Sequence, residues 1–233
     1  AAIETANHYT IDLDEGLLEE ITQIVEYPTA FLGKFDAKYL QLPEVVLITS
    51  MREHQRYFYV RNQTGALEPH FVAVRNGNDQ YLDNVRAGNE KVLVARLEDA
   101  LFFVHEDKEK SIDDYVKKLE KVTFHAEIGT MTEKTRRVGE IARYLHELWQ
   151  VNGTVDPSQV TITDAQIDRA AQIYKFDLVT GMVDEFSELQ GIIGELYALE
   201  AGEDPAVAAA IREHYLPTGA DGELPSTPLG RLM

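Results

Sequence analysis

The sequence predicts an α+β fold, with a mixed α/β part over residues 1–110 and an all-helical part with an extended C-terminal tail over residues 111–233. Two observations support this division. Short runs of aromatic and β-branched residues, which favour strands, all lie before Gly77. Apolar residues at helical spacing and helix-capping patterns fill the remainder of the chain.

The first part contains both kinds of element. Apolar residues at helical spacing predict a short amphipathic helix over residues 14–25, and a second helical stretch covers residues 37–40. We expect strands at residues 45–48, 57–60 and 71–74, the last two forming a hairpin. Helical spacing returns over residues 83–104, where the residues expected to face the core are Val92, Ala95, Ala100, Leu101 and Val104.

The second part carries local signals for helix starts. Ser111 with Asp114, and Thr163 with Gln166, have the spacing of capping boxes. Asp204-Pro205 is typical of an N-cap followed by proline at the first helical position. A helix over residues 130–150 carries one apolar stripe, formed by Val138, Ile141, Leu145 and Leu148.

Composition limits the classes of function. The 233 residues include 40 acidic and 22 basic side chains, a net charge of -18, which opposes general attraction to nucleic acid. The chain has no cysteine, which excludes disulfides and cysteine-based metal or nucleophile chemistry. We find no apolar run long enough to cross a membrane and no signal-peptide pattern, and so expect a cytoplasmic protein. Neither end resembles a natural terminus, and we interpret the chain as a fragment.

Two groups of basic residues are candidate sites for binding phosphate or RNA. Arg52, His54, Gln55 and Arg56 cluster next to expected strands, and guanidinium groups bind phosphate bidentately. The alternative is a solvated turn whose arginines pair with Glu53. In the second part, Lys134 and Arg137 belong to a concentration of basic residues that also includes Lys117, Lys118, Lys121, Arg136 and Arg143. The alternative there is an ordinary helix surface that neutralises neighbouring acids.

A metal site of the kind found in HD-type phosphohydrolases is a further possibility. His146-Glu147 and Glu213-His214 lie in helical segments, and such enzymes collect histidines and aspartates from several helices. A His-Asp dipeptide is required, however, and the sequence has none. Lys175 stands where a ligand is expected, and lysine is not a usual metal ligand. We therefore assign no metal ligand and no catalytic residue.

Six strings, in the expected order, resemble the beta subunit of the tetrameric bacterial glycyl-tRNA synthetases. They are Val25–Pro28, Gly33–Phe35, Met51–Phe58, Val85–Phe103, Lys175–Gly194 and Ala208–Pro217. The resemblance implies a central fragment of that subunit with an HD-like helical domain in its second part. It also implies an alpha subunit that holds the ATP, magnesium and glycine site, with tRNA(Gly) as a further partner. No cofactor is implied for this fragment.

Three functions follow as hypotheses. The first is a tRNA-binding and scaffold segment of a glycine–tRNA ligase. The second is an HD-type metal-dependent phosphohydrolase. The third is a pure subunit-interaction module, which an acidic surface with a few exposed aromatic residues would suit.

We predict that this chain alone does not activate glycine. Activation requires groups that clamp the ATP phosphates, usually with magnesium, and no phosphate-binding loop is visible in the sequence. Glycine-dependent exchange of pyrophosphate into ATP measures the step directly. Exchange above background by the purified chain, free of alpha subunit, would show the prediction to be wrong.

Overall fold

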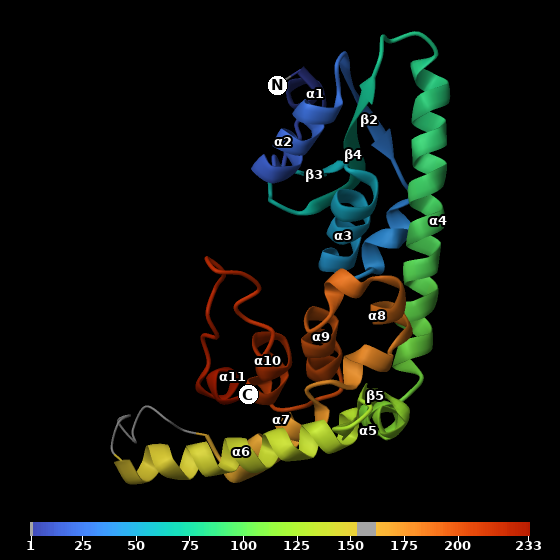
Figure 1. The fold of residues 1–233 in the computed structure, drawn as a ribbon. Helices are drawn as coiled ribbons and strands as arrows, with labels where there is room; N and C mark the ends of the chain where they lie inside the picture. Colours follow the sequence, from blue (N-terminus) through green and yellow to red (C-terminus); the bar gives the residue numbers. More distant parts are fainter. Residues whose placement is uncertain (1, 153–161) are drawn as a thin grey trace. The chain divides into compact units, whose positions relative to one another are not determined.

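The computed structural model describes residues 2–152 and 162–233 (Figure 1). The chain forms two compact units, here called the first unit (up to Val104) and the helical unit (His105–Met233). The α+β class is confirmed, because a four-stranded antiparallel sheet in the first unit is followed by a mostly helical region. The domain division after residue 110 stays a prediction.

The first unit is built around its sheet, whose strand order is β1-β3-β4-β2. Its elements are α1 (Ala2–Asn7), β1 (Thr10–Ile11), α2 (Glu15–Ile24), β2 (Pro28–Lys34), η1 (Ala37–Gln41), α3 (Glu44–Gln55), β3 (Phe58–Arg61), β4 (Leu67–Asn76) and the greater part of α4 (Leu82–Lys108). The predicted helices at residues 14–25 and 37–40 and the hairpin of β3 with β4 are confirmed.

The two faces of the sheet pack against different helices, as Figure 1 shows for α2 and the first turns of α4. On one face, Leu17 and Ile21 of α2 pack with residues of the strands, which are Phe58, Val60 and Val72. On the other face, the Phe71 ring stacks on Tyr57 with 4.4 Å between centroids and lies over Gly33 on the neighbouring strand. A Cβ at residue 33 would come within 2.3 Å of that ring, so glycine is required there.

Three predictions for the first unit are wrong. Residues 45–48 lie in α3 rather than in a strand, because a short apolar run fits a buried helix as well as a buried strand. The strands β1 and β2 were not predicted. On α4 the buried face comprises Leu93, Leu97, Ala100 and Val104, whereas Val92 and Ala95 are exposed.

The helical unit consists of short helices joined by tight connections. After the last turn of α4 come α5 (Ile112–Lys118), η2 (Leu119–Lys121), β5 (Thr123–His125), β6 (Gly129–Thr130), α6 (Met131–Asn152), α7 (Asp164–Ile173), η3 (Phe176–Val179), α8 (Gly181–Glu185), η4 (Ser187–Leu189), α9 (Ile192–Glu200), α10 (Pro205–Glu213) and α11 (Pro228–Leu232). Both capping boxes and the Asp204 cap are confirmed. Within the described ranges, no helix is long and apolar enough to span a membrane.

One expectation for this unit is corrected. The small hairpin of β5 and β6 lies within the part predicted to be wholly helical.

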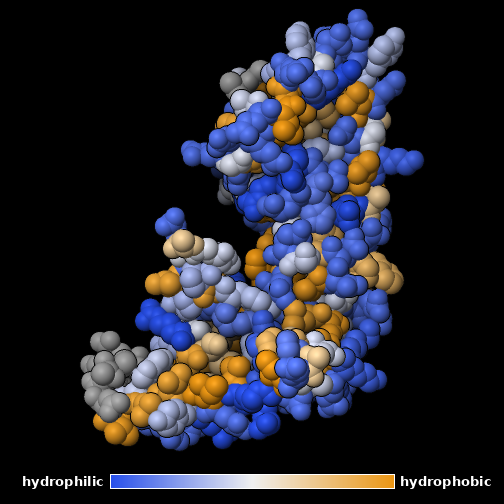
Figure 2. All heavy atoms as spheres, viewed as in Figure 1, coloured by the Kyte–Doolittle hydropathy of each residue, from blue (hydrophilic) through white to orange (hydrophobic). Residues whose placement is uncertain are grey.

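The apolar stripe predicted on α6 lies partly at the surface. Ile141 is 58% exposed, whereas the buried side chains of this helix are Thr135, Ala142 and His146. Figure 2 shows apolar side chains of α6 at the surface. A stripe at helical spacing indicates an apolar face, but it does not say what covers that face.

Glu213, at the end of α10, holds the C-terminal tail against the helical unit. Its carboxylate is 1% exposed and accepts hydrogen bonds from the backbone N–H and the hydroxyl of Ser226 and of Thr227. Burial alone raises the pKa of Glu213, but these hydrogen bonds outweigh burial and lower that pKa below its ordinary value of 4.5. A buried carboxylate thus fixes the start of α11.

We predict that Glu213→Gln lowers the free energy of unfolding by about 2 kcal/mol, because the amide nitrogen faces hydrogen-bond donors and leaves one pair unsatisfied. The carboxylate contributes fully above its unfolded-state pKa of 4.5 and loses that contribution as pH falls through the lower folded-state value. Urea unfolding between pH 3 and 7 measures both effects. Glu223→Gln, at an exposed position of the same tail, is the control. Equal stability of the two variants would contradict this role.

Candidate functional site

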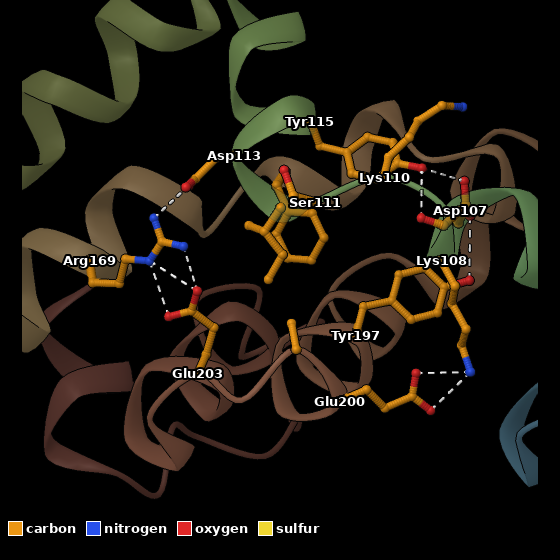
Figure 3. Close-up of a pocket in the computed structure, with 13 residues that line it drawn as sticks. Asp107, Lys108, Lys110, Ser111, Asp113, Tyr115, Arg169, Tyr197, Glu200 and Glu203 are labelled. Carbon is orange, nitrogen blue, oxygen red and sulfur yellow. Dashed lines mark hydrogen bonds and ion pairs between the residues drawn. The ribbon is translucent and has the colours of Figure 1, made fainter.

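The helical unit contains a cavity of about 400 Å³ (Figure 3). Ile112 and Tyr115 of α5, Phe176 of η3 and Tyr197 of α9 supply its apolar wall. Figure 3 shows charged side chains around this wall. An apolar pocket with a few polar groups is the usual form of a binding site for a small molecule or for an anchoring side chain.

Two groups of ion pairs border the cavity. Arg169 of α7 donates to Glu203 and, over 2.8 Å, to Asp113 of α5. Opposite them, Lys108 pairs with Glu200, with 2.9 Å between nitrogen and oxygen. Two carboxylates therefore face the one guanidinium of Arg169. None of the residues that the sequence predicts to bind tRNA lines this cavity.

Asp107 lies at the base of this cavity and is 3% exposed. Its carboxylate accepts from the backbone N–H of Gly181 (2.8 Å) and of Met182 (2.9 Å) at the start of α8. It also accepts from the hydroxyls of Tyr115 (2.9 Å) and Tyr197 (3.4 Å). One buried side chain therefore joins the end of α4 to three later helices.

The first predicted tRNA-binding group lies at the end of α3 rather than between two strands. Arg52 contacts Asp14 and Glu53, at 3.3 Å and 2.7 Å. Arg56 ends the helix in a left-handed conformation with φ 58° and pairs with Glu20 of α2 at 2.7 Å. His54 and Gln55 are half-buried in the last turn. The two arginines thus join α3 to α2 through exposed ion pairs.

The second predicted group lies on α6. Of the basic residues in this region, Lys117, Arg136 and Arg143 pair with carboxylates, namely those of Asp114, Glu140 and Asp168. Lys134 and Arg137, one helical turn apart, have no carboxylate oxygen within 4.0 Å among the described residues. These two cations are therefore available to an anion.

The position expected for a metal ligand holds a cation. Lys175 is 9% exposed, and its ammonium lies 3.8 Å from the centroid of the Tyr215 ring. Burial first and the nearby Lys134 second lower the pKa of Lys175 to about 8. Burial, with a smaller contribution from Lys175, lowers the pKa of His214 to about 3. A cation in this place repels a divalent metal, which argues against the phosphohydrolase hypothesis.

Comparison with known proteins decides the family. The chain matches the glycyl-tRNA synthetase beta subunit family over residues 1–233. The chain belongs to this family. The glycine–tRNA ligase beta subunit of Streptococcus gordonii is 58% identical over 232 residues, which cover 100% of this chain and 33% of the relative. That of Lactiplantibacillus plantarum is 55% identical over 233 residues, which cover 100% of this chain and 32% of the relative. The chain thus spans about a third of the length of these relatives.

In this member of the family, the structure places each predicted tRNA-binding group on one helix. Arg52–Arg56 lie at the end of α3, and Lys134 and Arg137 lie on α6. The cavity was not predicted from the sequence. Its lining comes from separate segments of residues 107–115, residues 169–176 and residues 197–203. No spacing along the chain indicates that these segments meet. Among the described residues, no group of three or more potential metal ligands comes together.

We predict that Asp107→Ala lowers the free energy of unfolding by about 3 kcal/mol, because it leaves two backbone N–H groups and two hydroxyls without their acceptor. Tyr197→Phe removes only the longest of these bonds and should cost under about 1 kcal/mol. Urea denaturation measures both changes. Asp113→Asn, at the cavity border, is the control. A cost for Asp107→Ala no larger than that of the control would rule out the role of Asp107.

Proposed function

We propose that this chain is a tRNA-binding and scaffold segment of the beta subunit of a glycine–tRNA ligase. The segment supports ATP-dependent charging of tRNA(Gly) with glycine by the alpha subunit. The family match over residues 1–233 is the observation that carries the proposal. The relatives are named as beta subunits of that ligase and align over the whole chain, which supports the same role here.

The division of labour between subunits is part of the proposal. ATP and magnesium act in the alpha subunit, and this segment binds no cofactor of its own. The enzyme works in the cytoplasm. The described surface offers cations for phosphate on α3 and α6, which suits a segment that positions tRNA rather than one that performs the chemistry.

The ion pairs of Arg52 and Arg56 are compatible with tRNA binding. The two side chains are 38% and 45% exposed, and their carboxylate partners are exposed to a similar degree. Exposed pairs of this kind contribute roughly 0–1 kcal/mol each. A phosphate accepts two parallel hydrogen bonds from one guanidinium, so it competes effectively with a single carboxylate oxygen.

One observation favours a second function, that of a subunit-interaction module. Three side chains of α6 are widely exposed: Ile141 (58%), Tyr144 (60%) and Val151 (82%). Exposed apolar surface on one helix face is typical of an interface with another protein. This function is compatible with tRNA binding by the arginines at the end of α3, because it uses a different element, α6, which also carries Lys134 and Arg137.

We predict that Arg52→Ala with Arg56→Ala raises the KM for tRNA in the enzyme assembled from complete alpha and beta subunits. The KM values for glycine and ATP should not change. The slope of log affinity against log salt should fall by about one unit for each phosphate group that the variant no longer binds. Steady-state aminoacylation and filter binding, both over a range of salt concentrations, measure these effects.

Glu20→Gln is the matched control for Arg56, because it breaks the same ion pair from the carboxylate side. If the arginine binds phosphate, Glu20→Gln retains wild-type tRNA affinity and only Arg56→Ala weakens it. If the pair is purely structural, both substitutions have the same effect. Wild-type tRNA affinity of the double arginine variant at every salt concentration would remove this group from the proposal.

A further inference from the structure

Two lysines of the helical unit lie close to one aromatic side chain. The Lys134 ammonium is 5.5 Å from the centroid of the Tyr174 ring and donates to its hydroxyl over 3.3 Å. The Lys175 ammonium is 5.6 Å from the same centroid and 3.8 Å from that of Tyr215. One ammonium comes from the first turns of α6 and the other from the residue before η3.

Among the described residues, both lysines lack the carboxylate partner that seven other cations of this unit have. Neither has a carboxylate oxygen within 4.0 Å in the part of the chain that the structure describes. Other lysines and arginines of the helical unit do pair with carboxylates, among them Lys108, Lys110, Lys117, Arg136, Arg143, Arg169 and Arg212. In a chain with 40 acidic residues and only 22 basic ones, two neighbouring cations left unpaired need an explanation.

The nearby carboxylate of Asp177 attracts Lys175 and acts to raise its pKa. Asp177 is fully buried; Oδ1 has no hydrogen-bond partner among the described residues, and the other oxygen accepts from the backbone N–H of Gly191 over 2.5 Å. A Cβ at Gly194 would approach that oxygen to 3.0 Å, so α9 packs tightly against the carboxylate. Asp177 therefore reduces the repulsion between the lysines without forming a hydrogen bond to either.

Desolvation makes the unpaired state costly. Lys175 is almost fully buried and Lys134 is half-buried, and burial lowers the pKa of both. Like charges near each other in a partly buried place destabilise the fold, and an anion between them removes that cost. Several buried polar atoms of this unit have no hydrogen-bond partner among the described residues, among them the Tyr215 hydroxyl, Nε2 of His214, Oδ1 of Asp177 and Nη2 of Arg137.

We propose that Lys134 and Lys175, together with the Tyr174 hydroxyl, form a binding site for a phosphate group. Phosphate offers several acceptor oxygens in a tetrahedral arrangement, which suits two ammonium groups and a hydroxyl that approach from different directions. The same charges exclude a metal ion. The phosphate comes either from the free ion or from an RNA backbone, and in the second case the site rests on the proposed tRNA-binding function.

The test compares the 233-residue chain with its Lys134→Met, Lys175→Met and doubly substituted variants. Methionine keeps the length of the apolar stem and removes the charge. Lys117→Met is the matched control, because its exposed ammonium pairs with Asp114. The probes are inorganic phosphate, compared with chloride at equal ionic strength, and an RNA hairpin of the tRNA(Gly) acceptor stem. Thermal unfolding measures the first interaction and filter binding the second, with circular dichroism to check folding.

We expect at least one probe to bind the wild-type chain and the control equally, and to bind each lysine variant about tenfold more weakly. A lysine-dependent rise in Tm with inorganic phosphate identifies the free ion as ligand. Lysine-dependent RNA affinity without that rise identifies an RNA phosphate. If both responses are absent, or survive both substitutions, the site is overturned. RNA binding that survives both substitutions leaves the proposed function standing. If Lys175→Met does not fold, Lys134→Met at the half-buried position decides.

Discussion

The helical unit depends on the buried carboxylate of Asp107. Asp107 is 3% exposed, and its carboxylate holds the groups that donate to it: the start of α8 and the hydroxyls of Tyr115 and Tyr197. The rings of these tyrosines form part of the cavity wall. The shape of the cavity is therefore a consequence of how one carboxylate is satisfied, rather than of apolar packing alone.

The same solution recurs twice in this unit. Asp177 accepts from the N–H of Gly191 at the start of α9, and Glu213 accepts from the N–H of Thr227 at the start of α11. The first N–H groups of a helix have no acceptor within the helix, and the helix dipole favours an anion at that end. Burial nevertheless raises the pKa of Asp177 to about 6, because the backbone donors it has do not offset full desolvation. Glu213, with hydroxyl and backbone donors from two residues, shows the opposite shift.

Local signals in the sequence predicted the helix starts correctly. They did not predict contacts between segments that are distant in sequence. The boxes at Ser111 and Thr163 involve residues three apart, so the pattern contains the whole interaction. The strand β2 carries no such signal, because its place depends on pairing with β4 some forty residues later. For α3, four consecutive apolar residues show no period, so the sequence does not distinguish a helix from a strand there.

The candidate sites follow the same rule. The sequence shows that four candidate residues are basic: Arg52, Arg56, Lys134 and Arg137. It does not show which of them form ion pairs, because the arginines of α3 pair with residues at the start of α2 and within it. Lys175 was visible only as a residue out of place in a metal-site pattern. Lys175 lies near Lys134 only because α6 packs against the segment that contains Tyr174, which is about forty residues after Lys134 in sequence.

An acidic chain can present cations to phosphate only where its carboxylates are occupied elsewhere. In the helical unit the carboxylates of Asp177 and Glu213 face inward and bind backbone N–H groups. Both carboxylates are next in sequence to residues near Lys175. Phe176 lies between Lys175 and Asp177. His214 follows Glu213, and its ring packs on that of Tyr174 with 4.7 Å between centroids. Asp177 still attracts Lys175, but its hydrogen bond goes to the start of α9. The hydrogen bonds that order α9 and α11 therefore also decide which carboxylates form close ion pairs with cations of this unit.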